Sequence, residues 1–197
     1  MDVAVHDLLR IDPEALIGDM PDWARSALAD APWVVVRRAL SSDGRIAVGV
    51  RGQTRDQRFA AWLPVAGVTA HVTPYDIVRD GLAGRRRMLP ALAALDTVLS
   101  VMAGTPYVWG PGGSVGFELV TGYLAVTEQS DLDIILRAPE YLDRARAADL
   151  LDRLPLRSDV RLEVPRGAVA LREYVRGGRM VLKTCEGPCL VDDPWDG

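Results

Sequence analysis

Two short runs near the middle of the chain, Trp109-Gly-Pro-Gly-Gly-Ser-Val-Gly-Phe-Glu-Leu119 and Ser130-Asp-Leu-Asp-Ile-Ile-Leu136, decide its fold. The first predicts a strand over residues 107–109, a glycine-rich turn over 110–114 and a helix over 115–120. The second predicts a strand over 131–136. Glycines let backbone N–H groups approach an anion, and a helix N-terminus favours negative charge. The turn is therefore a candidate phosphate site, although an ordinary strand-to-helix turn has the same pattern.

The second run also places two acidic side chains on one face of its strand. Alternation along a strand puts Asp131 and Asp133 on the same side, with Cα atoms about 6.6 Å apart. Asp159 begins another expected strand, over residues 159–164, and would add a third carboxylate to the same sheet surface. Carboxylates are hard oxygen ligands that suit Mg²⁺, and a cation would offset their mutual repulsion. The pattern indicates a metal site, and a solvated strand start is the alternative.

Beyond these runs, helices and strands continue to alternate. Apolar residues at helical spacing predict helices over 88–102 and 138–154, and another helix is expected over 168–175. A last strand is expected over 180–184. This order predicts an α+β fold, with a mixed sheet and its helices on one face.

The first part of the chain favours strands, over residues 32–36, 46–50 and 68–72, with a hairpin turn at 41–44. Thr73 and Pro74 then have the pattern of a helix N-cap and first turn. The composition changes at Gly84-Arg-Arg-Arg87, where a solvated linker is favoured over a docking site. The sequence thus predicts a β-rich domain over residues 1–84 and a second domain over 85–197.

Composition excludes several classes of protein. The chain has 197 residues and a formal net charge of −4, whereas a general nucleic-acid binder needs a basic surface. No apolar run reaches the roughly 18 residues of a membrane span, and no secretory signal is visible. Cys185 and Cys189 cannot form a disulfide framework, so we expect thiols and a cytoplasmic location.

A Gly-Ser turn, an Asp-x-Asp strand and a later single Asp together resemble the nucleotidyltransferase superfamily. The resemblance implies a catalytic core of the polymerase-β type in residues 85–197. It also implies that Gly113 and Ser114 hold a triphosphate. Asp131, Asp133 and Asp159 would then hold Mg²⁺ and carry the catalysis.

Over nearly its full length, the chain is similar to the phosphoribosyl-dephospho-CoA transferases, which are the holo-acyl-carrier-protein synthases of malonate decarboxylase. The likeness includes both runs quoted above and Arg58-Phe-Ala-Ala-Trp62. It implies transfer of the prosthetic group from 2'-(5''-triphosphoribosyl)-3'-dephospho-CoA to a serine of the apo acyl carrier protein, with release of pyrophosphate. Asp159 is a candidate to deprotonate that serine.

Three arginines and two histidines are further candidates for a role in binding or structure. Arg51, Arg55 and Arg58 are candidates to bind the donor's phosphates or the carrier protein, because arginine suits phosphate geometry. His6 and His71 are expected to be structural. Two alternative functions stay open: a non-catalytic module that binds a carrier protein, and a nucleotidyltransferase with another hydroxyl acceptor.

Overall fold

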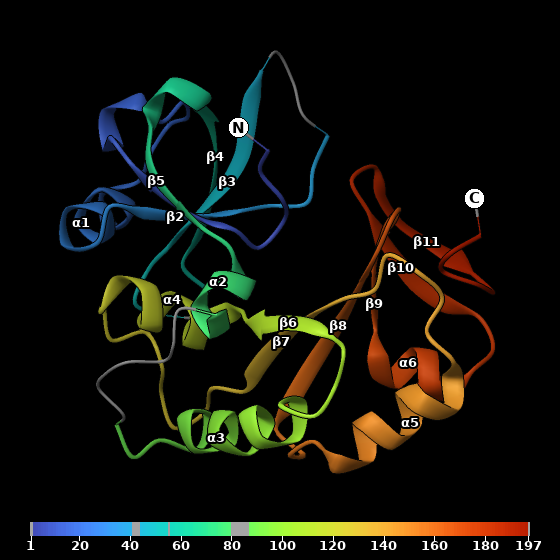
Figure 1. The fold of residues 1–197 in the computed structure, drawn as a ribbon. Coiled ribbons are helices and arrows are strands. Elements are labelled where there is room, and N and C mark those ends of the chain that lie inside the picture. Colours follow the sequence, from blue (N-terminus) through green and yellow to red (C-terminus); the bar gives the residue numbers. More distant parts are fainter. Residues whose placement is uncertain (1, 41–43, 55, 80–86, 197) are drawn as a thin grey trace.

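The computed structural model describes residues 2–40, 44–54, 56–79 and 87–196, which form two sheets facing one another (Figure 1). The N-terminal sheet is antiparallel throughout, in the order β4-β3-β2-β1-β5. Its elements in chain order are β1 (Leu8–Ile11), η1 (Pro13–Ala15), α1 (Asp22–Asp30), β2 (Trp33–Val36), β3 (Arg45–Arg51), β4 (Arg58–Pro64), η2 (Val65–Gly67) and β5 (Val68–Val72).

The C-terminal sheet has six strands in the order β11-β10-β9-β8-β7-β6, and it is mixed because β7 and β8 are parallel while the other pairs are antiparallel. Its strands are β6 (Val108–Pro111), β7 (Leu132–Arg137), β8 (Ser158–Val164), β9 (Gly167–Ala170), β10 (Met180–Thr184) and β11 (Gly187–Val191). The helices of this half are α2 (Pro74–Arg79), α3 (Pro90–Met102), α4 (Gly113–Thr121), α5 (Arg144–Arg153) and α6 (Leu171–Arg176).

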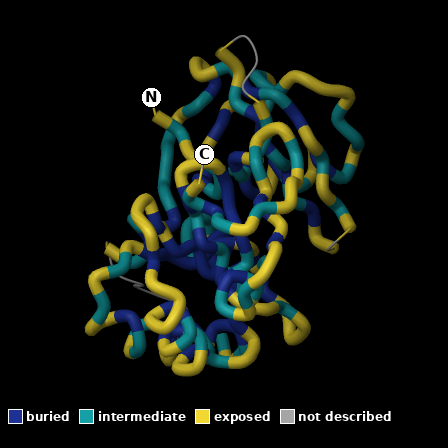
Figure 2. The backbone as a smooth tube through the Cα atoms, turned by 90° about the vertical axis from the view of Figure 1, so that its right-hand side faces the viewer, coloured by how far each residue is buried: buried dark blue, intermediate teal, exposed yellow. Residues whose placement is uncertain are grey.

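Strand alternation divides the C-terminal sheet into two unlike faces. Leu132, Ile134 and Leu136 of β7 are almost fully buried and belong to the same core as residues of α3, α5 and α6. These helices lie together below the sheet in Figure 1, and Figure 2 shows the buried backbone concentrated inside the molecule. The other face therefore remains available to the N-terminal half.

The two halves are joined by apolar contacts and by α2. Leu8 of β1 and Phe117 of α4 share a small buried cluster with Ala31. Helix α2 begins with a capping arrangement in which the Asp76 carboxylate accepts hydrogen bonds from Thr73. It packs so closely on β6 that a Cβ at Gly110 would lie 1.9 Å from the Pro74 carbonyl oxygen. These contacts fix how the two sheets face each other.

Much of the expected pattern is confirmed. The strands expected over 32–36, 46–50, 68–72, 159–164 and 180–184 are present within a residue or two, and so are the mixed sheet and the helix after Thr73. The hairpin turn at 41–44 and the domain boundary at residue 84 fall on or beside residues outside the described ranges.

Several expected boundaries are wrong. The helix expected over 138–154 begins only at Arg144, because Pro139 interrupts the run and Asp143 caps the helix through the Arg146 N–H. Residues 167–170 are strand β9 rather than helix, because they pair with β8 across a tight hairpin. Strands β1, β4 and β11 and helix α1 were not expected from the sequence pattern.

No helix within the described ranges is long and apolar enough to span a membrane.

Candidate active site

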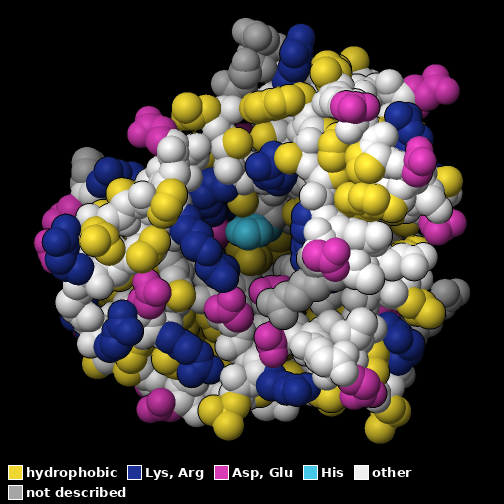
Figure 3. Space-filling model, turned by 180° about the vertical axis from the view of Figure 1, so that it is seen from behind, with side chains coloured by type: hydrophobic (Ala, Val, Ile, Leu, Met, Phe, Trp, Pro, Cys, Tyr) yellow, Lys and Arg dark blue, Asp and Glu magenta, His cyan; other side chains and the backbone are white. Residues whose placement is uncertain are grey.

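A cleft of about 850 Å³ separates the two sheets and is lined by residues from both. β2, β3 and β4 form one wall, and β7, β8 and the β10–β11 hairpin form the other, with the start of α4 between them. Figure 3 shows a hollow in which a histidine is surrounded by Lys and Arg side chains. Of the two histidines in the chain, His6 lines this cleft.

Two of the three predicted acidic residues meet in this sheet. Asp133 on β7 is the register partner of Asp159 on the parallel strand β8, and neighbouring strands lie about 4.8 Å apart. Asp131, expected inside the strand, precedes β7 and is exposed. Asp133 lines the cleft, whereas the Asp159 carboxylate accepts a hydrogen bond from Arg161 at 2.8 Å.

The glycine-rich segment lies directly over Asp133. β6 continues through Pro111, and α4 begins at Gly113, two residues earlier than expected. The Gly112 N–H donates to the Asp133 backbone carbonyl at 2.9 Å. Gly113 has φ +55°, and a Cβ on it would lie 1.8 Å from Asp133 Oδ2. Only glycine fits here, so the N-terminus of α4 and the carboxylate share one small space.

Ser114 is the less exposed half of the Gly-Ser pair. Its side chain is buried in the first turn of α4, while Gly113 is exposed and lines the cleft. Any anion at this helix N-terminus would therefore meet the backbone of Gly113 first.

The electrostatics of Asp133 follow from its position. Burial raises the pKa of Asp133 above its ordinary value, and the neighbouring Asp159 raises it further, against the opposing effects of Arg161, His6 and Arg51. A buried carboxylate beside a second carboxylate favours a proton or a cation. This pair is thus a place where a positive charge would be stabilised.

Cations line the rest of the cleft. Arg51 and Arg58, both expected near phosphate, lie on its N-terminal wall, and Arg55 falls outside the described residues. Across from them are Arg161 and Lys183. An anion that entered the cleft would meet positive charge on both walls.

An ion-pair network lies deeper in the cleft, and its partners were not expected from the sequence. Glu163 on β8 accepts hydrogen bonds from Arg38 Nη2 at 2.5 and 2.7 Å, and its Oε1 lies 3.0 Å from His6 Nε2. These partners lower the pKa of Glu163 in spite of its burial. The pairing could not be read from spacing, because the residues are more than 120 positions apart in the chain.

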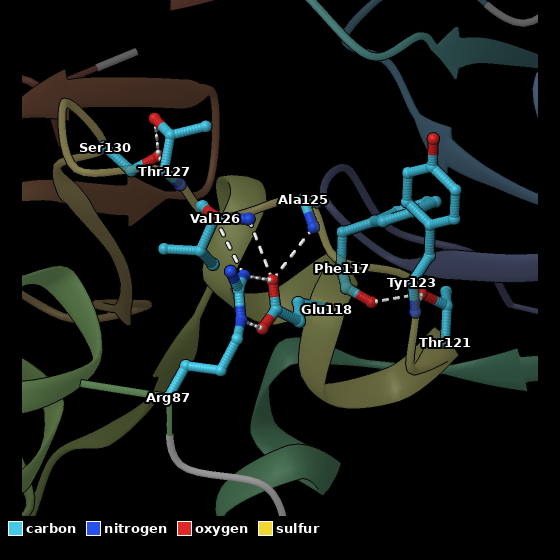
Figure 4. A network of polar contacts seen from close by, with 9 residues as sticks. All are labelled: Arg87, Phe117, Glu118, Thr121, Tyr123, Ala125, Val126, Thr127 and Ser130. Atoms are coloured by element: carbon cyan, nitrogen blue, oxygen red, sulfur yellow. Dashed lines mark hydrogen bonds and ion pairs between the residues drawn. The ribbon is translucent and has the colours of Figure 1, made fainter. Parts of the chain in front are cut away.

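A second acidic network lies at the far end of α4 (Figure 4). The carboxylate of Glu118 accepts hydrogen bonds from Arg87 at 3.0 and 2.6 Å and from the backbone N–H groups of Ala125 and Val126 at 2.8 Å each. These bonds give Glu118 a structural role. Arg87 is a structural partner, not part of the solvated linker that we expected.

The three predicted ligands do not close into a ready metal centre. Within residues 2–40, 44–54, 56–79 and 87–196, no three His, Cys, Asp or Glu side chains gather closely enough to hold an ion. Asp133 and Asp159 come together, and exposed Asp131 stays apart from them in this conformation.

Comparison with known proteins places these residues in a family. Residues 4–74 match the family model described as the phosphoribosyl-dephospho-CoA transferase MdcG N-terminal domain, and residues 80–194 match the model of its C-terminal domain. No solved structure matches the chain.

Curated relatives agree over nearly the full length of both chains. The protein is 44% identical to a phosphoribosyl-dephospho-CoA transferase of Pseudomonas fluorescens (strain Pf0-1), over 97% of this chain and 94% of that protein. It is 46% identical to one of Pseudomonas syringae pv. tomato, over 98% and 93%, and 39% identical to one of Pseudomonas aeruginosa, over 96% and 92%. The chain therefore belongs to the phosphoribosyl-dephospho-CoA transferase family.

Proposed function

We propose that this protein transfers the phosphoribosyl-dephospho-CoA group from 2'-(5''-triphosphoribosyl)-3'-dephospho-CoA to a serine of the apo acyl carrier protein of malonate decarboxylase. The observation that carries the proposal is the position of Asp133, paired with Asp159 and covered by the first residue of α4 inside a cation-lined cleft. The family relationship supports the same reaction.

Mg²⁺ is the proposed cofactor, and the acid pair fits it. Asp133 is half-buried beside Asp159, so a nearby positive charge would stabilise its carboxylate. Asp133 and Asp159 would hold the ion, and Asp131 would join them if the segment before β7 moves toward the cleft. Bound Mg²⁺ would neutralise charge that develops on the transferring phosphoryl group.

The residues of the chain would bind and orient the two reactants. The N-terminus of α4, with Gly113 and Ser114, is placed to favour the triphosphate, and Arg51 and Arg58 add positive charge from the opposite wall. The serine Oγ forms a bond to the phosphorus that carries the ribosyl oxygen, and the bond from that phosphorus to pyrophosphate breaks. Such a reaction depends mainly on positioning and charge neutralisation.

We extend the proposal to the fold of the second half. Residues 85–197 would be a nucleotidyltransferase core of the polymerase-β type. A glycine-rich strand-to-helix turn beside the acidic residues of two adjacent strands supports this assignment. The reaction would take place in the cytoplasm, as expected for a protein with two free cysteines.

Mass spectrometry of the apo-carrier provides the test. The purified carrier is incubated with the donor, Mg²⁺ and this protein, and its mass is expected to rise by the phosphoribosyl-dephospho-CoA group on one serine while pyrophosphate is released. An unchanged carrier mass, with the protein bound to the carrier, would support a non-catalytic module instead. Modification of a different hydroxyl compound alone would support another acceptor.

A further inference from the structure

His6 has a backbone conformation that costs free energy and that the structure maintains with several hydrogen bonds. Its φ is +76°, and within the described residues it is the one non-glycine residue with positive φ. The Ala4 N–H donates to the Asp7 carboxylate at 2.8 Å, and the His6 N–H donates to the Val36 carbonyl at 3.0 Å. Backbone strain in a residue other than glycine is often found where a side chain must be presented at a functional site.

The contact with Glu163 fixes which nitrogen of His6 can accept a proton. Glu163 has a lowered pKa and is held ionised by Arg38, and an ionised carboxylate can only accept hydrogen bonds. The hydrogen of the neutral imidazole is therefore on Nε2, 3.0 Å from Glu163 Oε1. The lone pair is then on Nδ1, which has no hydrogen-bond partner among the described residues.

Other side chains of the cleft are poorly suited to remove a proton. Charged arginine and lysine side chains carry hydrogen-bond donors and no acceptor, so they cannot take up a proton. Asp159, the base that we first expected, has its Oδ2 occupied by Arg161 at 2.8 Å. Asp133 faces Gly113 and would be a ligand of the proposed cation. Among the described residues that line the cleft, His6 is the one imidazole, the side-chain type that most often serves as a general base.

We infer that His6 is the general base of the transfer and that Glu163 is the residue that positions it. This inference rests on the proposed function. The serine O–H proton moves to His6 Nδ1 as the serine Oγ bonds to the α-phosphorus, and the phosphorus–oxygen bond to pyrophosphate breaks. His6 leaves the step protonated on both nitrogens, with its new charge beside Glu163, and returns the proton to solvent.

Charged groups from several elements contact His6 or line the same cleft. Glu163 on β8 and Arg38 after β2 form the network with it, and Asp7 follows it in its own turn. Across the cleft and along its walls are further charges, namely Arg37, Arg51 on β3, Arg58 on β4, Asp133 on β7, Arg161 on β8 and Lys183 on β10. Burial raises the pKa of Tyr75 on α2, and the charge of Glu163 raises it further, to about 12. The Tyr75 side chain therefore stays neutral.

The decisive experiment replaces His6 and measures the full pH profile of carrier modification. His6→Asn is the primary variant, because asparagine tolerates positive φ and preserves the turn. We expect kcat to fall about 100-fold with KM for the donor within about twofold, and the decline of kcat at acidic pH that imidazole causes to disappear. In His6→Ala, added imidazole is expected to restore part of the rate. The matched control is His71→Gln, which removes the imidazole of the other histidine, outside the cleft, keeps an N–H donor for its partner Asp7 and should keep kcat within about twofold.

Two results would overturn the inference while the function stands. These are a His6→Asn variant with kcat within about threefold of wild type, or one that retains the acidic decline. If His6→Asn does not fold, the kcat and pH profile of His6→Gln are compared with wild type in the same way. The response of His6→Ala to added imidazole then provides the second test. A merely structural His6 would change the melting temperature without any response to imidazole. An inactive wild-type protein would overturn the proposed function, and this inference with it.

Discussion

Two carboxylates on the cleft-facing surface of the C-terminal sheet have opposite chemistry because their partners differ. Glu163 accepts three hydrogen bonds from Arg38 and His6, and these partners lower its pKa. Asp133 lies on the adjacent strand β7, beside Asp159, which is four residues before Glu163 on β8. It faces this second carboxylate and the backbone of Gly113, and its pKa is raised. One end of this surface is a completed ion-pair network. At the other end Asp133 makes no ion pair among the described residues, and Arg161, His6 and Arg51 only partly offset the rise of its pKa.

The difference is the one expected between a structural acid and the proposed metal ligand. A buried carboxylate that serves stability is surrounded by donors, as Glu118 is by Arg87 and two backbone N–H groups. A carboxylate with a raised pKa beside a second acid is instead a candidate for function, and this observation supports the proposed role of Asp133 independently of its sequence motif.

Asp133→Asn should have the largest effect of any single change at this surface. The amide cannot supply the negative charge that binds the proposed cation, so we expect kcat for carrier modification to fall by at least about 10³-fold. Stability in urea should be unchanged or slightly higher, because a buried charge beside Asp159 is removed. Asp131→Asn tests whether the exposed residue joins the site: a comparable loss would make it a third ligand. Near-normal transfer by Asp133→Asn would contradict the comparison.

Glu118→Gln should lower the stability of the fold and leave the rate of transfer unchanged, which is the opposite of the effect expected for Asp133→Asn. The change removes the charge that pairs with Arg87 in a buried position, and breaking such a pair costs about 3 kcal/mol of unfolding free energy. Urea denaturation measures the loss, and transfer per folded molecule should match wild type at low temperature. A large drop in kcat with normal stability would instead make Glu118 part of the active site.

Local sequence signals predicted that Asp133, Asp159 and Gly113 lie together, but they did not predict the surroundings of these residues. The structure brings the three together on β7, β8 and the start of α4, whereas Asp131 lies apart, and the prediction was possible because strand alternation and glycine chemistry are local properties. The Arg38–Glu163–His6 network brings together residues from opposite domains. No local pattern encodes such a contact.

The absence of long-range information in local sequence patterns also explains the wrong predictions of secondary structure. The helix expected from residue 138 failed because apolar spacing continued through Pro139, while the chain used Asp143 as its N-cap. Residues 167–170 are small and apolar, which suits a helix or a strand equally, and pairing with β8 and β10 decided for a strand. Tertiary contacts thus overrode weak local preference.

Gly113→Ala should have an intermediate effect, and the chain offers a matched control for it. A Cβ at Gly113 would lie 1.8 Å from Asp133 Oδ2, so the carboxylate must move, and we expect about a 100-fold loss of kcat. Gly122, at the other end of α4, also has positive φ (+74°) but has nothing within 4 Å of a Cβ. Gly122→Ala therefore measures backbone strain alone, about 1 kcal/mol, with near-normal transfer. Equal kinetic effects of the two changes would disprove the contact with Asp133.

The smallest expected effect, and the one that tests the comparison most directly, is the pH dependence of stability. Because the pKa of Asp133 is raised above its ordinary 3.8, its contribution to stability is present below pH 3.8 and is lost as the pH rises through its folded value. Because the pKa of Glu163 is lowered below 4.5, its contribution is present above pH 4.5 and is lost as the pH falls through its folded value.

Urea denaturation between pH 3 and 7 without divalent cations separates the two. Relative to wild type, Asp133→Asn should gain stability as the pH rises, whereas Glu163→Gln should be weaker at neutral pH and approach wild type in acid. Differences with the same sign in both variants would mean that the two carboxylates have similar surroundings. Opposite signs are expected because Glu163 is already paired with Arg38, whereas Asp133 has no ion pair among the described residues.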